Sequence, residues 1–225
     1  MCPDDVNLKQ RYILTVLYFS TSGDGWNTCT RDETTPCNGV AFLTGVSECQ
    51  WGGIECDVEK RVASITLDSN NLAGPIPNEI GSLTYLVELD LDDNAITGSL
   101  PSSLGQLKFL EIVDLDKNQL VGDIPESLYD ATALRVLDLD SNALTGTIST
   151  QIGNLSSLYF VQLNSNQFEG TVPTQIGSLN DLTYLSLYQN SIIGPIPSGL
   201  CKSDVRLYAN CDICTDGCCT KCLNQ

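Results

Sequence analysis

The chain has 225 residues, of which 42% are hydrophobic and 17% are charged, a balance that indicates one folded unit with a large core and excludes disorder. Its 28 acidic and 11 basic residues give a formal net charge of −17, which repels phosphate backbones, so nucleic acid is excluded as a partner. Histidine is absent, which removes the usual general base and the commonest metal ligand. The composition therefore predicts a protein that is not an enzyme and uses no cofactor.

Residues 1–61 are expected to form an N-terminal cap. Residues 4–19 read as an amphipathic helix, with Asp4 or Asp5 at its start and apolar residues that cover the open end of a core. No hydrophobic signal segment precedes Cys2, and no run of about 18 apolar residues follows it. We therefore expect no membrane insertion within this chain, and a leader that is absent from it.

A repeat of 24 residues follows the cap and recurs six times without insertion. Each copy contains the frame L-x-L-x-x-N-x-L-x-G, as in LDLDDNAITG and LDLDSNALTG. The asparagines of the frame are Asn70, Asn94, Asn118, Asn142, Asn166 and Asn190. A period of this length with this frame is typical of a leucine-rich repeat. We assign residues 62–200 to six repeats and residues 201–225 to a C-terminal cap.

The frame predicts how each repeat folds. Leu89 and Leu91 alternate on a short strand and point into the core, whereas Asp90 and Asp92 point outward. One repeat cannot bury its own apolar face, so stacked copies form a parallel sheet, and the asparagine column bonds backbone groups at each turn. The predicted fold is an α/β right-handed solenoid with a short-stranded parallel sheet on its concave face, a helical N-terminal cap and a disulfide-rich C-terminal cap.

A proline element follows most copies of the frame and carries a family resemblance. Segments such as Leu100-Pro101 and Val172-Pro173 precede a Gly-x-Leu step. The pattern L-x-G-x-I-P followed by G-x-L resembles plant-type leucine-rich repeats, which occur in receptor-kinase ectodomains and in secreted inhibitors of cell-wall-degrading enzymes. Two departures are expected to be local: Ser149 replaces a proline, and Asp130-Ala131-Thr132 replaces the Gly-x-Leu step in the third repeat.

Eleven cysteines lie in the two caps and none lies between residues 57 and 200. Six strands about 4.8 Å apart separate the caps by about 25–30 Å, whereas bridged Cα atoms lie within about 7 Å, so pairing is confined to each end. This density indicates an oxidising, extracellular compartment, secreted or cell-surface. The segment CQWGGIEC is similar to the end of plant-type N-terminal caps, and this resemblance implies a Cys49–Cys56 pair. We also assign Cys29–Cys37, and leave Cys2 as the odd cysteine.

The C-terminal cap contains six cysteines: Cys201, Cys211, Cys214, Cys218, Cys219 and Cys222. Two C-x-x-C units within them offer a tetrahedral zinc site as one alternative. A cap closed by disulfides is favoured because the rest of the chain has the features of a secreted protein. A redox C-x-x-C site lacks the thioredoxin-like βαβ context that it needs. We assign no metal site to these residues.

The outward positions of the strands supply the candidate ligand-binding residues. Acidic residues fill two adjacent columns: Asp90, Asp114 and Asp138 in one, and Asp68, Asp92, Asp116 and Asp140 in the other. Apolar or aromatic residues lie beside them at Ile112, Val136, Phe160, Tyr184 and Tyr188. Aromatic anchors beside a charged field are typical of binding hot spots. The family usually has Ser in the column that begins at Asp68, so its acidity is a departure.

Three interpretations of the acidic columns stay open. Carboxylates about 5 Å apart repel by about 1 kcal/mol in bulk water, or about 3 kcal/mol at an effective dielectric of about 20, so we expect the face to stay hydrated. The first interpretation is a solvated face that only aids solubility. The second is a docking face for a protein or peptide, basic in character. The third is weak binding of Ca²⁺, which takes oxygen ligands.

The sequence favours a non-enzymatic recognition module, like a receptor ectodomain, that binds a protein or peptide on the concave face. The alternatives are a secreted inhibitor of a cell-wall-degrading hydrolase and a structural or adhesive cell-surface protein. Asn154 begins the sequon Asn-Leu-Ser on the predicted convex side, and a secreted protein would be glycosylated there. Such a glycan would leave the concave face free.

Overall fold

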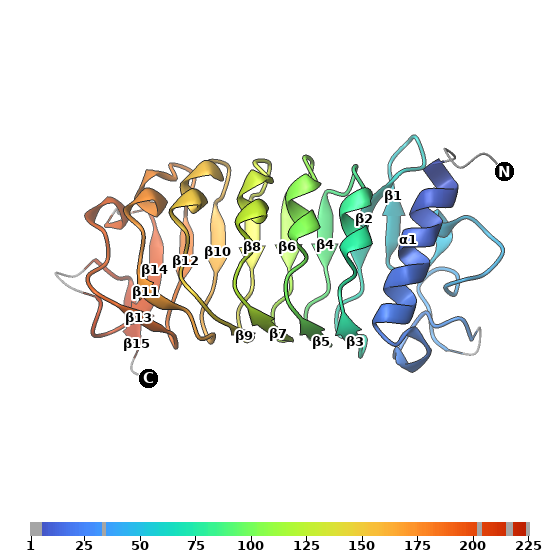
Figure 1. Cartoon of the computed structure of the whole chain (residues 1–225), viewed down its shortest axis with the longest axis horizontal. Coiled ribbons are helices and arrows are strands. Elements are labelled where there is room, and N and C mark those ends of the chain that lie inside the picture. The colour runs from blue at the N-terminus through green and yellow to red at the C-terminus, as the bar shows by residue number, and fades with distance from the viewer. Residues whose placement is uncertain (1–5, 33–34, 202–203, 215–217, 224–225) are drawn as a thin grey trace.

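The structure is a computed structural model that describes residues 6–32, 35–201, 204–214 and 218–223. The chain winds into an elongated solenoid with the helix α1 (Val6–Ser20) at one end and the C-terminus at the other (Figure 1). Short helices form one side of every turn and the strands of the main sheet form the opposite side. This arrangement confirms the predicted leucine-rich-repeat solenoid.

The main sheet runs the full length of the solenoid and has the strand order β1-β2-β4-β6-β8-β10-β12-β14-β15. Only β1 pairs antiparallel, with β2; every later neighbour pairs in parallel. The bounds of these strands are β1 (Ile54–Cys56), β2 (Val62–Thr66), β4 (Glu88–Asp90), β6 (Ile112–Asp114), β8 (Val136–Asp138), β10 (Phe160–Gln162), β12 (Tyr184–Ser186), β14 (Arg206–Asn210) and β15 (Lys221–Leu223).

Short 3₁₀-helices and minor strands complete each turn. The minor strands are β3 (Ala73–Pro75), β5 (Ala95–Gly98), β7 (Gln119–Gly122), β9 (Ala143–Leu144), β11 (Glu169–Thr171) and β13 (Ser191–Ile193). The helices are η1 (Gly23–Gly25), η2 (Glu48–Gln50), η3 (Asn78–Ser82), η4 (Ser102–Gln106), η5 (Glu126–Asp130), η6 (Thr150–Asn154), η7 (Thr174–Ser178) and η8 (Ser198–Leu200). A proline directly precedes each of η3–η8, except η6, which follows Ser149. The fixed φ of proline suits the residue before the first turn of a helix.

Leucine and isoleucine side chains of successive turns fill the space between sheet and helices. Leu89, Leu91, Ile96 and Leu104 of one turn are all fully buried, and equivalent residues repeat along the axis. Each contributes about 1.5–3 kcal/mol relative to exposure, so the core stabilises the solenoid from end to end.

The six frame asparagines, which we call the asparagine ladder, bond the backbone of adjacent turns. The Asn118 amide nitrogen donates to the carbonyl oxygens of Leu91, Leu115 and Asp116 at 2.9, 3.2 and 3.0 Å, and its oxygen accepts from the Ile96 amide at 2.9 Å. The chain turns here, and the side-chain amide supplements the backbone hydrogen bonds between adjacent turns. These residues are structural, as their periodicity predicts.

The two departures of the repeat are accommodated locally. Ser149 caps η6 with its side chain, which accepts from the Gln151 amide. The expected position of the second departure is wrong by one residue, because η5 places Tyr129, not Asp130, where other repeats have glycine. Tyr129 is buried at 1% exposure, and Ala131 ends the helix as leucine does elsewhere. A bulky residue therefore fits inside the third turn without a change of register.

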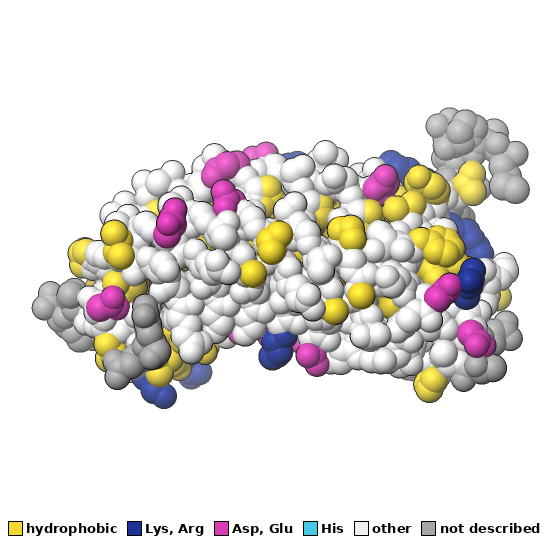
Figure 2. Space-filling view, turned by 60° about the horizontal axis from the view of Figure 1, so that its bottom comes forward, with side chains coloured by type: hydrophobic (Ala, Val, Ile, Leu, Met, Phe, Trp, Pro, Cys, Tyr) yellow, Lys and Arg dark blue, Asp and Glu magenta, His cyan; other side chains and the backbone are white. Residues whose placement is uncertain are grey.

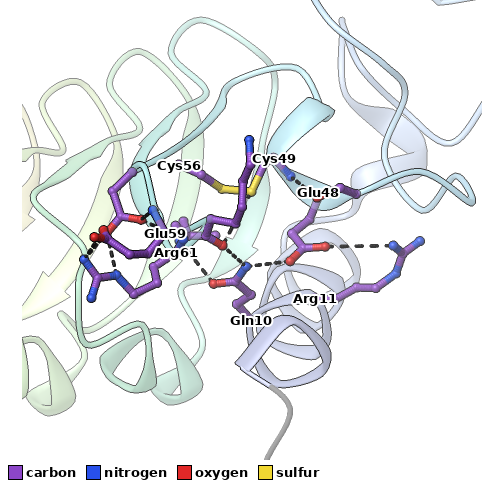
Figure 3. Close-up of a disulfide and its surroundings, with 11 residues drawn as sticks. Gln10, Arg11, Glu48, Cys49, Cys56, Glu59 and Arg61 are labelled. Carbon is purple, nitrogen blue, oxygen red and sulfur yellow. Dashed lines mark hydrogen bonds and ion pairs between the residues drawn. A yellow bond between two sulfur atoms is a disulfide. The ribbon is translucent and has the colours of Figure 1, made fainter. Parts of the chain in front are cut away.

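The N-terminal cap is fastened by polar contacts and disulfides (Figure 3). Gln10 on α1 donates to Glu48 at 2.6 Å and to the Lys60 carbonyl oxygen at 2.8 Å, and accepts from the Val62 amide at 3.1 Å. Trp51 is 1% exposed and packs inside the cap. Asp4, Asp5 and Cys2 lie outside the described residues.

Five disulfides close the two caps. Cys29–Cys37 and Cys49–Cys56, the pairs expected from the sequence, form in the N-terminal cap. The C-terminal cap contains Cys201–Cys218, Cys211–Cys222 and Cys214–Cys219, so all six of its cysteines are bridged. Within the part of the chain that the structure describes, no helix is both long enough and apolar enough to span a bilayer.

Candidate ligand-binding face

The outward face of the main sheet brings the predicted binding residues together. The strand register places Ile112, Val136, Phe160 and Tyr184 side by side on neighbouring strands. The same register aligns Asp90, Asp114 and Asp138. Residues separated by 24 positions in sequence thus become direct neighbours, which makes a continuous surface from single residues of each repeat.

An aromatic stack occupies the C-terminal half of this face. The rings of Phe160 and Tyr184 lie 4.6 Å apart with an interplanar angle of 15°, and those of Tyr184 and Tyr208 lie 5.3 Å apart. Tyr188 is half-buried in the next column. Stacked rings hold one another in place, so a partner would meet a rigid apolar surface.

Tyr208 was missed from the sequence because it lies in the segment assigned to the C-terminal cap. Its strand β14 nevertheless pairs with β12 and extends the sheet. The signal was Asn210 at the end of this strand, whose oxygen accepts from the Gln189 amide at 2.7 Å and whose nitrogen donates to the Asn190 carbonyl oxygen at 3.1 Å. The frame around it has Ala209 and lacks the usual spacing, which hid the extra turn.

The seven aspartates predicted on this face, which we call the aspartate columns, occupy its N-terminal half. Asp68 is exposed, and Asp90, Asp92, Asp114 and Asp140 are half-buried. The expectation that the whole face stays hydrated is wrong for Asp116 and Asp138, which are 8% and 5% exposed. Side chains of adjacent strands are close enough to cover one another, and Gln162 donates a hydrogen bond to Asp138.

Crowding and burial change the acidity of these carboxyls. Burial raises the pKa of Asp138 to about 8, with the charges of Asp114 and Asp140 adding to the effect. Burial together with neighbouring carboxylates also raises the pKa values of Asp90, Asp92 and Asp114 to about 6. These four aspartates therefore change charge in the mildly acidic to neutral range, where ordinary aspartates do not.

Two groups of carboxylates within the columns could hold a cation. One oxygen from each of Asp68, Asp90 and Asp92 lies within 4.8 Å of the others, and the second group is formed by Asp114, Asp116 and Asp138. Hard cations such as Ca²⁺ prefer such oxygen ligands, but require six to eight of them. In the second group, Lys117 already donates to Asp116 at 2.9 Å, so a protein cation partly neutralises it.

The opposite side of the molecule has a different character. Figure 2, which turns the edge with the minor strands toward the viewer, shows hydrophobic side chains scattered singly and few charged side chains over the middle of the solenoid. Val121 and Ile193 are exposed on minor strands. Isolated apolar side chains are normal on a protein surface. The end of η6 presents Asn154, the predicted glycosylation site, as an exposed residue away from the sheet.

Comparisons with known proteins agree with this architecture. Family models described as leucine-rich repeat match residues 84–144 and 181–203. A probable leucine-rich-repeat receptor-like serine/threonine-protein kinase of Arabidopsis thaliana is 41% identical over 44 residues, which are 20% of this chain and 6% of that protein. The chain therefore contains leucine-rich repeats, and it is similar to a plant receptor-like kinase that contains them.

Solved structures extend the similarity over most of the chain. The ectodomain of the receptor kinase SOBIR1 from Arabidopsis thaliana matches with a TM-score of 0.69 and 28% identity, covering 86% of this chain and 98% of that one. The ectodomain of the Arabidopsis receptor kinase HAESA, in complex with a peptide hormone ligand, matches with a TM-score of 0.65 and 26% identity, covering 91% and 37%. The chain thus spans a small part of the kinase and about a third of the HAESA ectodomain, but nearly all of the SOBIR1 ectodomain.

Proposed function

We propose that this chain is an extracellular, non-enzymatic recognition module that binds a protein or peptide on its concave face. The observation behind the proposal is the juxtaposition, on one sheet, of the aspartate columns with the stack of Phe160, Tyr184 and Tyr208. The stack supplies apolar contact area and the columns supply charge. The likeness to the HAESA ectodomain, whose structure contains a peptide hormone, supports the same use of the fold.

The charge pattern favours a basic ligand. Lys117 is the only cation facing the aspartate columns among the described ion pairs, and it is engaged by Asp116. A lysine or arginine of the ligand would relieve repulsion between neighbouring carboxylates, so binding should weaken as salt is added. Weak Ca²⁺ binding at the same carboxylates would compete with such a ligand. The five disulfides and the receptor-like fold support an extracellular or cell-surface setting.

A peptide-display selection against the whole chain tests this function. We expect enriched peptides that combine basic and aromatic residues and that bind at least tenfold more weakly to Asp92→Lys or Phe160→Ala variants. Asp181→Lys is the matched control, because Asp181 is exposed and lies outside the strands of the sheet. Peptides that bind all variants equally would show that the concave face is not the binding site.

A further inference from the structure

A cavity of about 870 Å³ opens where the N-terminal cap meets the first repeat. Its wall comes from the cap segments around the Cys29–Cys37 and Cys49–Cys56 disulfides and from the end of β2. Side chains with polar groups that line it include Asn38, Gln50, Glu55, Thr66 and Asp68. Asp68 also belongs to the aspartate columns, so the cavity continues the concave face.

Glycine residues let the segments of the cavity wall pack closely against one another. A side chain on Gly52 would begin 2.2 Å from the Cys29 sulfur, and Gly39 and Gly53 have φ of +133° and +80°. Such backbone conformations are strained for other residues. The wall includes three glycines and cysteines of two disulfides, which restrain its shape. A ligand entering it would meet a preformed site, at little entropic cost.

The charge of the cavity is negative and uncompensated. Glu55 and Asp68 are exposed carboxylates in its lining, and no lysine or arginine of the described residues lines it. Neither carboxylate takes part in an ion pair within the described part of the chain. Asp90 and Asp92 lie next to Asp68, with oxygens within 4.8 Å. Negative charge focused in a hollow attracts cations more strongly than the same charge on a flat surface.

We propose that this cavity holds a lysine or arginine side chain of the peptide that the concave face binds, an inference that rests on the proposed function. The carboxylates of Glu55 and Asp68 neutralise the cation, while Asn38 and Gln50 can accept its further hydrogen bonds. A guanidinium group fits this site better than an ammonium group, because the carboxylates and the side-chain amide oxygens together can accept hydrogen bonds from its five donors. Free volume in the cavity is ample for such a side chain.

The position of the cavity also gives the spacing of the ligand. Four strand steps separate β2, at the cavity, from β10, which presents Phe160. At about 4.8 Å per step these strands lie about 19 Å apart, a distance that about six residues of extended peptide span. The ligand should therefore have a basic residue about six positions from the apolar or aromatic residue that meets the stack.

An NMR titration of the whole chain tests the cavity with small probes. The probes are N-acetyl-arginine amide and N-acetyl-citrulline amide, which have similar shapes but differ in charge. We expect the arginine probe alone to shift the backbone amide signals of Gly39, Gly52 and Gly53. A Glu55→Gln/Asp68→Asn double variant should bind it at least tenfold more weakly, whereas Asp181→Asn should bind it unchanged.

Equal shifts with both probes, or arginine binding unchanged in the double variant, would overturn the inference. Both substitutions replace exposed side chains, so we expect the double variant to fold like the parent chain. The chemical-shift dispersion of its spectrum checks this. The two proposals can fail separately. Display-selected peptides that need Phe160 but ignore the double variant would reject the cavity alone, whereas arginine binding in the cavity without any peptide binding would reject the concave-face function.

Discussion

Two sets of polar residues, the asparagine ladder and the aspartate columns, run along the same solenoid and have opposite effects on its stability. The asparagine ladder lies inside the turns, and every member described above bonds backbone groups, as Asn118 does with four partners. The aspartate columns lie on the sheet face and bring like charges together, with Asp138 buried to 5% exposure. Burial of a polar group stabilises a fold when its hydrogen bonds are made, and burial of crowded charge does not. The asparagine ladder therefore stabilises the fold, whereas the aspartate columns are the set that we propose binds a ligand.

The largest effect should come from breaking the asparagine ladder. Asn118→Ala removes four hydrogen bonds and leaves the buried Ile96 amide without its acceptor, whereas the carbonyl oxygens of Leu91, Leu115 and Asp116 each keep another donor. We expect the free energy of unfolding, measured by urea denaturation with disulfides intact, to fall by about 3 kcal/mol. Asn154→Ala is the control, since Asn154 is exposed and its loss should cost less than about 0.5 kcal/mol. Similar losses in both variants would mean that the ladder is not what stabilises the turns.

The aspartate columns should give a stability that decreases as pH rises. The folded-state pKa values of Asp90, Asp92, Asp114 and Asp138 lie above the value of about 3.9 for an unfolded aspartate, so the folded chain holds more protons between the two values. The stabilisation is therefore fully present below about pH 3.9 and is lost as pH rises through about 6 for Asp90, Asp92 and Asp114 and about 8 for Asp138. Thermal unfolding between pH 4 and 9 measures it.

Asp138 should dominate this pH dependence, because it is the most buried of the columns' carboxyls and has the largest shift. Its ionisation should remove on the order of 3 kcal/mol of stability. Asp138→Asn keeps the shape without the charge, so it should be more stable than the parent chain at pH 9 and nearly equal to it at pH 4. Asp181→Asn should follow the parent at every pH. A parent chain whose stability rises with pH would contradict the raised pKa values.

The smallest expected effect is that of Ca²⁺. With a dissociation constant on the order of 1 mM, an equal concentration of CaCl₂ would stabilise the folded chain by about 0.4 kcal/mol at pH 7. The shift in melting temperature should shrink in Asp90→Asn, because that variant removes one of the three carboxylates of the Asp68, Asp90 and Asp92 group. Choline chloride at matched ionic strength is the control for screening. An equal shift with choline chloride would remove Ca²⁺ from the candidate ligands.

Much of the fold follows from the spacing of single residues. The 24-residue period fixes which side chains share a column, because parallel strands of equal turns stack in register. The same period shows that Ser149 occupies a position that is proline in other repeats, so it could be recognised as a local substitution. The period was less informative in the third repeat, where Tyr129 takes a glycine position, and at β14, where the frame around Asn210 is incomplete. Both irregular places needed the actual path of the backbone.

The sequence by itself determined the solenoid, the confinement of cysteine pairs to each end and the composition of the concave columns, because periodic apolar residues can be buried in only one way. Tertiary structure alone decided how deep Asp116 and Asp138 lie, that Tyr208 joins the aromatic stack, and that a cavity opens beside Asp68. Burial and hollow space depend on how neighbouring turns pack and on disulfide-bound loops. Those loops have no period from which their shape could be read.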